Sequence, residues 1–164
     1  MSEIEIFLKF NKNCYLNKIE ELRNIIKELR ELKERNKSEK FKKYINESFL
    51  VSCMRGNLEI VKELYKEYKE LLKISDKNED NFRAACYSEN IELIKYLLEI
   101  EPNINISANN EEAFRAGCVN KRIDIIRFLY EIKSDINISI NDEEALRNSC
   151  VVGDIEILKL LQKN

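Results

Sequence analysis

The most reactive side chains in this sequence are those of five cysteines, because a thiolate can attack an electrophile or bind zinc. They stand at Cys14, Cys53, Cys86, Cys118 and Cys150, and the last four recur every 32 or 33 residues. No CxxC pair brings two of them together, and the chain has no histidine to act as a general base or metal ligand. We therefore predict that the thiols are buried as small packing residues, and we expect no catalytic residue, no metal site and no cofactor.

Three acidic pairs form the second set of candidate residues, because neighbouring carboxylates can act as general acid and base. The pairs are Glu79–Asp80, Glu111–Glu112 and Glu143–Glu144. Each pair falls in the first turn of a predicted helix, where negative charge complements the helix dipole. The sequence therefore predicts helix capping at these positions and no catalysis.

The cysteines and the acidic pairs belong to a unit that recurs along the chain. Residues 111–129 read EEAFRAGCVNKRIDIIRFL, and similar stretches occupy residues 46–64, 79–97 and 143–161. A fixed period near 33 residues is typical of helical solenoids, in which stacked units bury a continuous core. The sequence predicts an all-α solenoid of about four clear repeats.

Each repeat has the pattern of two antiparallel helices. The predicted first helices are Ser48–Arg55, Asn81–Ser88, Ala113–Asn120 and Ala145–Val152. The second helices begin near Leu58, Ile91, Ile123 and Ile155, where apolar residues recur at helical spacing. In two of the turns between them, Gly56 and Gly153 can adopt a positive φ.

A degenerate repeat precedes these four. Phe10, Cys14 and Ile19 occupy the same slots as the aromatic, cysteine and isoleucine of the later copies. Ile4–Phe10 begins this cap, and Ile19–Glu34 has the pattern of an amphipathic helix. The basic segment Arg35–Lys43 shows no helical period, and two interpretations stay open: a solvated connector or a docking patch. We predict a cap and connector over residues 1–45 and four repeats over 46–164.

The segment GNLEIVKEL at Gly56–Leu64 resembles the ankyrin repeat, and the resemblance extends from Asn46 to Leu161. It implies an ankyrin-like solenoid. The family's Thr-Pro-Leu-His tetrapeptide is missing, so Arg83, Arg115 and Arg147 must be held in another way, for which we expect the adjacent acidic pairs. The variant EAFRxxC is similar to the ankyrin arrays of giant, mimivirus-like viruses of amoebae.

The sequence has no histidine, no Gly-rich phosphate loop and no Gly-x-Ser-x-Gly motif, so we expect that the protein is not an enzyme. The resemblance implies that it binds a partner protein on the concave face of the solenoid. The candidate binding residues are Tyr44, Met54, Arg55, Lys77, Tyr87, Asn109, Val119, Asn120, Ile140, Asn141, Val151 and Val152. Met54, Tyr87, Val119 and Val151 follow a cysteine in each repeat and should form an apolar line. Two interpretations of this line stay open: a binding surface, or half-buried packing between repeats.

Charge and hydropathy limit the classes of partner that we expect. With 28 basic and 30 acidic residues, the net charge of −2 favours neither nucleic acid nor an anionic membrane. Nucleic-acid binding has only Arg35–Lys43 in its favour. No signal peptide or membrane span is visible, so we expect a cytoplasmic protein, in the host cytoplasm if it is viral. We expect a protein partner, no small-molecule substrate, and a monomer or weak self-association.

The alternative function is a structural or self-assembling scaffold. The residues Gln162-Lys163-Asn164 follow the last predicted helix directly, without a polar capping repeat. Solenoid ends that lack a cap tend to stack on other copies.

Overall fold

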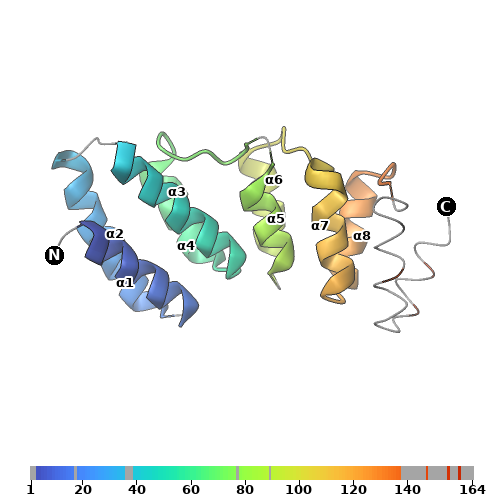
Figure 1. Cartoon of the computed structure of the whole chain (residues 1–164), viewed down its shortest axis with the longest axis horizontal. Helices are drawn as coiled ribbons and strands as arrows, with labels where there is room; N and C mark the ends of the chain where they lie inside the picture. Colours follow the sequence, from blue (N-terminus) through green and yellow to red (C-terminus); the bar gives the residue numbers. More distant parts are fainter. Residues whose placement is uncertain are drawn as a thin grey trace. The chain divides into compact units, whose positions relative to one another are not determined.

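The computed structural model describes residues 3–16, 18–35, 39–76, 78–88 and 90–137, with the isolated positions 147, 155 and 159. Within these ranges the chain forms eight α-helices and no strand, which confirms the predicted all-α class (Figure 1). Contacts divide the chain into two compact units, Met1–Ile74 and Ser75–Asn164.

The first unit consists of two helical hairpins. Its helices are α1 (Glu3–Tyr15), α2 (Ile19–Arg35), α3 (Glu39–Met54) and α4 (Leu58–Tyr68). Helix α1 packs on α2 and α3 on α4, while α1 also contacts α3 and α2 contacts α4 (Figure 1). The predicted degenerate repeat is therefore a complete helix pair, stacked on the pair that follows it.

The repeated slots make the core of this unit. The aromatic and cysteine slots of both hairpins are fully buried at Phe10, Cys14, Phe49 and Cys53. The second helices bury their apolar faces against them, with Leu22, Ile25, Ile26 and Leu29 from α2 and Ile60, Val61 and Leu64 from α4. Each helix is amphipathic, so its apolar face is covered only when a neighbouring helix packs on it.

The prediction for the basic connector was wrong. Helix α3 begins at Glu39, so the second half of Arg35–Lys43 is helical, and α3 is much longer than the predicted Ser48–Arg55. The cause is Phe41, which is buried one turn before Ile45 and has its ring centroid 6.1 Å from that of Phe7. The surrounding lysines hide this apolar period in the sequence. The predicted division of the chain after residue 45 stays a prediction.

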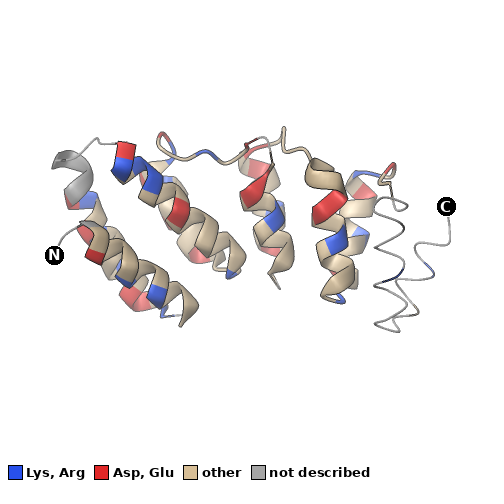
Figure 2. Ribbon diagram, viewed as in Figure 1, with Lys and Arg blue, Asp and Glu red and all other residues tan. Residues whose placement is uncertain are grey.

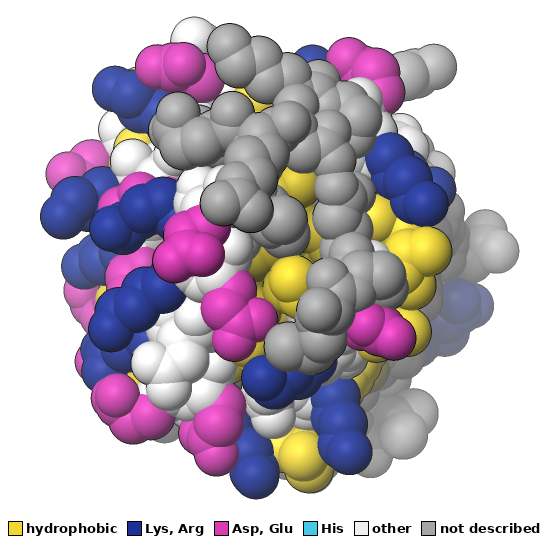
Figure 3. Space-filling model, turned by 90° about the vertical axis from the view of Figure 1, so that its left-hand side faces the viewer, with side chains coloured by type: hydrophobic (Ala, Val, Ile, Leu, Met, Phe, Trp, Pro, Cys, Tyr) yellow, Lys and Arg dark blue, Asp and Glu magenta, His cyan; other side chains and the backbone are white. Residues whose placement is uncertain are grey.

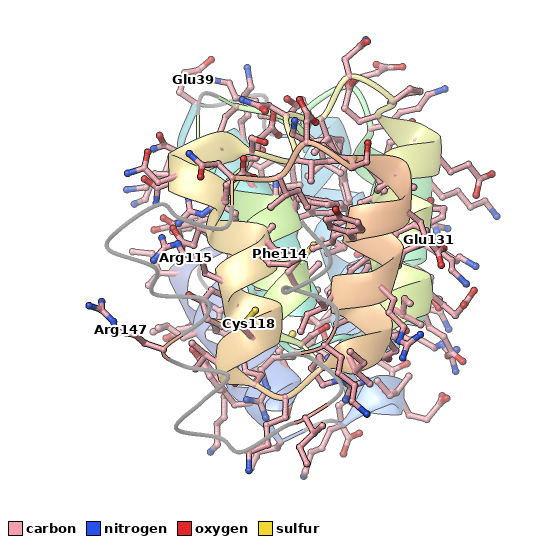
Figure 4. All side chains as sticks on the ribbon, turned by 90° about the vertical axis from the view of Figure 1, so that its right-hand side faces the viewer. Glu39, Phe114, Arg115, Cys118, Glu131 and Arg147 are labelled. Atoms are coloured by element: carbon pink, nitrogen blue, oxygen red, sulfur yellow. The ribbon has the colours of Figure 1, made fainter. Side chains whose placement is uncertain are left out.

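The second unit repeats the hairpin arrangement. Its helices are α5 (Asp80–Tyr87), α6 (Ile91–Ile100), α7 (Ala108–Val119) and α8 (Ile123–Ile132). Helix α5 packs on α6 and α7, and α7 packs on α8. Figure 4 shows Phe114 and Cys118 on the side of α7 toward α8, with Arg115 on the other side. The fourth predicted repeat, including Ala145–Val152, lies almost entirely outside the described residues.

The turns inside the hairpins follow the sequence in part. Gly56 adopts the predicted positive φ of 68°, and Lys121 has a φ of 58° at the equivalent position of the later repeat. The predicted turn glycine Gly153 lies outside the described residues. Gly117 has a different role: a Cβ at this residue would lie 2.9 Å from Cγ1 of Ile126, so α7 approaches α8 more closely than a side chain there would allow.

Helix α7 does not begin as predicted. The helical segment starts at Ala108, and Asn109, Asn110 and Glu111 have left-handed backbone angles inside it, so the regular helix follows a kink. Asparagine tolerates this conformation better than most residues. Glu111, the last residue of the kink, is buried.

We predict that replacing the buried Phe114 by alanine lowers the free energy of unfolding by about 3–5 kcal/mol, because the cavity adds to the lost burial. The matched control is Phe128→Ala in α8 of the same hairpin, where the ring is only half-buried and the loss should be clearly smaller. Urea denaturation of both variants measures the difference. Equal losses would show that Phe114 is not a core residue.

We also predict that the described cysteines resist alkylation in the native protein. The side chains of Cys14, Cys53, Cys86 and Cys118 are buried. Burial raises the pKa of Cys14 to about 11, although a hydrogen bond with Ser52 and the charge of Arg55 act against it, and burial raises the pKa of Cys53 and Cys86 as well. Mass spectrometry after iodoacetamide treatment should find these thiols labelled only in denaturant, and rapid native labelling would contradict their burial.

Candidate functional site

The residue that follows each of the four described cysteines lies on the protein surface. In the second unit 46% of Tyr87 and 48% of Val119 is exposed, on α5 and α7 respectively. This exposure leaves open both interpretations of the slot, a binding surface or half-buried packing between repeats. Two adjacent helices of this unit therefore present an aromatic and an aliphatic side chain to solvent.

A charged network surrounds Tyr87. Arg83 Nη1 lies 2.7 Å from Oδ1 of Asp80, and its Nη2 lies 2.9 Å from Oε2 of Glu112. The Tyr87 hydroxyl donates to Oε1 of Glu112 at 3.4 Å, and Asn109 Nδ2 donates to Oε2. Figure 2 shows the underlying pattern, an acidic segment followed by a basic one on both α5 and α7. The prediction that acidic pairs hold Arg83 is confirmed, and the pair of the following repeat takes part.

The network sets the protonation of its members. Partial burial acts to raise the pKa of Glu112, but hydrogen bonds from Arg83 and Asn109 and the charges of Arg83 and Arg115 outweigh it, so the pKa lies below its ordinary value. Partial burial and the charge of Glu112 raise the pKa of Tyr87. At neutral pH the carboxylate is therefore ionised, and the tyrosine hydroxyl keeps its proton and donates it.

The first acid of the two described pairs has a different role from the predicted cap. Glu79 and Glu111 are buried, and neither Glu79 nor Ser107, the residues that precede α5 and α7, makes a side-chain capping bond. Oε1 of Glu79 accepts hydrogen bonds from the Asn105 amide at 3.1 Å and the Ser75 hydroxyl at 2.7 Å. Oε1 of Glu111 accepts from the Asn137 amide at 3.4 Å. Each of these carboxylates therefore holds, as a clamp, the backbone of the linker that follows its helix pair. We call this linker the arm, and it contains Asn105 after α6 and Asn137 after α8.

The first unit uses an amide for the same clamp. Asn46 stands at the equivalent position, and its Oδ1 accepts from the Lys73 amide at 2.8 Å while its Nδ2 donates to the Leu71 carbonyl at 2.9 Å. The clamp therefore recurs in three repeats with a neutral or an acidic side chain. This recurrence identifies Glu79 and Glu111 as structural acceptors.

An apolar stripe on α1 was missed by the sequence interpretation. Ile4, Leu8 and Tyr15 are 45%, 64% and 53% exposed, and Met54 on the adjoining α3 is 40% exposed. We call these four residues the α1 patch. The Arg55 guanidinium lies 5.3 Å from the Tyr15 ring centroid, and its Nη2 donates to the Tyr15 carbonyl at 3.4 Å. The signal for it was present, since Tyr15 follows Cys14 as Met54 follows Cys53.

The opposite side of the first unit is highly charged. Arg23 on α2 binds Glu59 and Glu63 of α4 at 2.6 and 2.8 Å, and Arg30 binds Glu67 at 2.6 Å. Figure 3 looks onto this end of the molecule and shows charged side chains crowding the left-hand side, while hydrophobic ones gather toward the right. The two sides of the unit thus differ in character.

The remaining predicted binding residues divide into three groups. Arg55, Asn109 and Asn120 are exposed. Tyr44 is half-buried, and its ring stacks on Phe7 with centroids 4.4 Å apart, so this residue packs within the first unit. The others lie outside the described residues: Lys77, Ile140, Asn141, Val151 and Val152.

The described residues hold no group of three or more Cys, Asp or Glu side chains that could bind a metal ion. In the same part of the chain, no helix combines the length and the apolar content needed to cross a bilayer.

We predict that Glu112→Gln lowers the free energy of unfolding by about 0.5–1 kcal/mol at neutral pH, because Arg83 loses a charged partner. The difference from wild type should persist above about pH 4.3 and shrink as the pH falls through the lower folded-state pKa of Glu112. The control is Glu92→Gln, which removes an exposed partner of Lys95 in α6. Urea titrations at several pH values test this; a pH-independent difference would contradict the role of the charge.

Comparison with known protein families agrees with this architecture. The family described as ankyrin repeats in three copies matches residues 49–142, more than half of the 164-residue chain. A search of curated proteins finds no significant match. The helix pairs, the recurring slots and this match lead to one conclusion: the chain belongs to the ankyrin-repeat family.

Proposed function

We propose that this chain is a non-enzymatic interaction module that binds a partner protein on the face formed by the first helices of its repeats, the concave face of the family's solenoid. Ankyrin repeats serve as protein–protein interaction modules in general. The observation that supports a site on this chain is the exposure of Tyr87 and Val119 on adjacent helices of one unit.

The surroundings of Tyr87 suit a binding residue. Interface energy concentrates in a few residues, and tyrosine and arginine are enriched among them. Tyr87 and Arg83 are both held by Glu112, so their side chains are positioned before a partner arrives. Positioning in advance reduces the conformational entropy that binding would otherwise cost. Val119 supplies apolar area beside them.

The cellular setting is part of the proposal. We infer a cytoplasmic protein, because four buried cysteines without disulfides suit a reducing compartment. The role of a viral adaptor for host proteins rests on the EAFRxxC pattern alone. Stacking through the C-terminal end, the alternative function, concerns residues outside the described ones, and oligomeric state stays a prediction.

The double substitution Tyr87→Ala, Val119→Asp tests the proposed function. The tagged protein is used to capture partners from a cell lysate, the partner is identified by mass spectrometry, and its affinity is then measured by calorimetry. We expect the double variant to keep its helical circular dichroism and to weaken binding by at least about 2 kcal/mol.

The control variant is Lys66→Ala, Glu70→Ala, which removes two exposed charges at the end of α4 and just beyond it. It should bind as the wild type does. A folded Tyr87→Ala, Val119→Asp variant that binds as tightly as this control would place the partner on another surface. Unfolding of the double variant would show that the two side chains have a packing role.

A further inference from the structure

We propose that the α1 patch, defined above as Ile4, Leu8, Tyr15 and Met54, docks the apolar face of an acidic amphipathic helix of a partner protein. This inference rests on the proposed function and deepens it by naming the chemistry of the partner. It concerns the first unit, whereas the proposed Tyr87 site lies in the second unit.

The patch has the geometry of a helix-docking stripe. Ile4, Leu8 and Tyr15 are four and seven residues apart on α1, so they project from one side of it over a length of about 16 Å at 1.5 Å per residue. Helices bind other helices through apolar residues at this spacing, over about three turns. Met54 extends the stripe onto α3, which packs against α1.

The core of the unit does not require these side chains. Helix α1 buries a separate set of residues on its inner side, namely Ile6, Phe7, Phe10 and Cys14. Single exposed apolar residues are ordinary on protein surfaces, but here three share one side of a thirteen-residue helix, with only the half-buried Asn11 between Leu8 and Tyr15. A patch of this kind marks an interaction site.

The rim of the patch favours an acidic partner. Lys12 is exposed one turn from both Leu8 and Tyr15, and Arg55 lies over the Tyr15 ring. On the neighbouring α3 the exposed carboxylate of Glu47 is already paired with Lys43 at 3.7 Å. Figure 2 shows both basic and acidic segments on α1 and α3. Acidic residues beside the apolar face of a bound helix would complement this rim.

The same rim argues against a second copy of the chain as the occupant. A symmetric dimer through the α1 patch would bring Lys12 and Arg55 of both copies to one interface. Like charges brought together in this way oppose association. An acidic amphipathic helix would cover the apolar side chains of the patch and would also place opposite charge beside Lys12 and Arg55.

The test uses a synthetic peptide as the probe and the full chain as the receptor. The peptide has about 16 residues, long enough for the stripe at 1.5 Å per residue, with leucines at i, i+4, i+7 and i+11, glutamates on its flanks and a fluorescein label. Fluorescence anisotropy should show saturable binding. A second peptide with lysine in place of every glutamate should bind at least about tenfold more weakly.

Variants of the chain locate the binding. The double substitution Leu8→Ser, Tyr15→Ser should weaken binding of the acidic peptide at least about tenfold. The matched control Ile132→Ser changes a residue of α8 that is 44% exposed and should have no effect. If the double variant loses helical circular dichroism, Lys12→Glu, Arg55→Glu is used instead, and it should reverse the preference between the two peptides.

Three results would overturn the proposal. They are no saturable binding of the acidic peptide, equal binding of the two peptides by the wild type, or binding of the acidic peptide by the α1 patch variants that is as tight as by the wild type. Sedimentation that reveals a dimer lost in Leu8→Ser, Tyr15→Ser would assign the α1 patch to self-association instead. The Tyr87→Ala, Val119→Asp variant separates the two proposals. If it loses the captured partner while the α1 variants keep it and no peptide binds, the proposed function stands and this inference fails.

Discussion

The structure depends on one constraint: a helix pair of this kind cannot cover its own apolar surface. The hairpin of α3 and α4 buries Phe49 and Cys53 fully, and helices α1 and α2 contact it on one side. In the second unit Phe114 is buried where α7 meets α5 and α8. Since each pair needs its neighbour, the repeated apolar slots must face inward in every described copy, and the variable positions are left to the surface.

Hydrophobic packing alone does not fix how an arm leaves one hairpin and enters the next. The recurring clamp does this, because Asn46, Glu79 and Glu111 each hold a backbone amide of the arm that follows. A backbone amide needs a hydrogen-bond partner, and the side-chain acceptor at this position supplies one without a strand. With the clamp in place, the second acid of the later pairs is free to hold Arg83, as Glu112 does.

The surface shows the consequence of this division of roles. Residues directly after the buried cysteines are exposed, and their types differ between repeats: tyrosine at positions 15 and 87, methionine at 54 and valine at 119. Within each unit the buried slots are therefore followed by exposed positions whose residue type varies. In the first unit Ile4 and Leu8 are exposed together with Tyr15 and Met54, while the opposite side carries the ion pairs of Arg23.

The sequence by itself determined the repeat period, the hairpin unit and the burial of the four described cysteines, because each depends on residue type and local periodicity. Only the tertiary structure decided the length of α3, the inward turn of Glu79 and Glu111, and the exposure of Ile4 and Leu8. The physical reason is the same in all three cases. A helical pattern tells which residues share a side of the helix, but whether that side is buried depends on a neighbour brought there by the fold. Phe41 is covered by Phe7 and Tyr68, whereas no described residue covers Leu8 to the same extent.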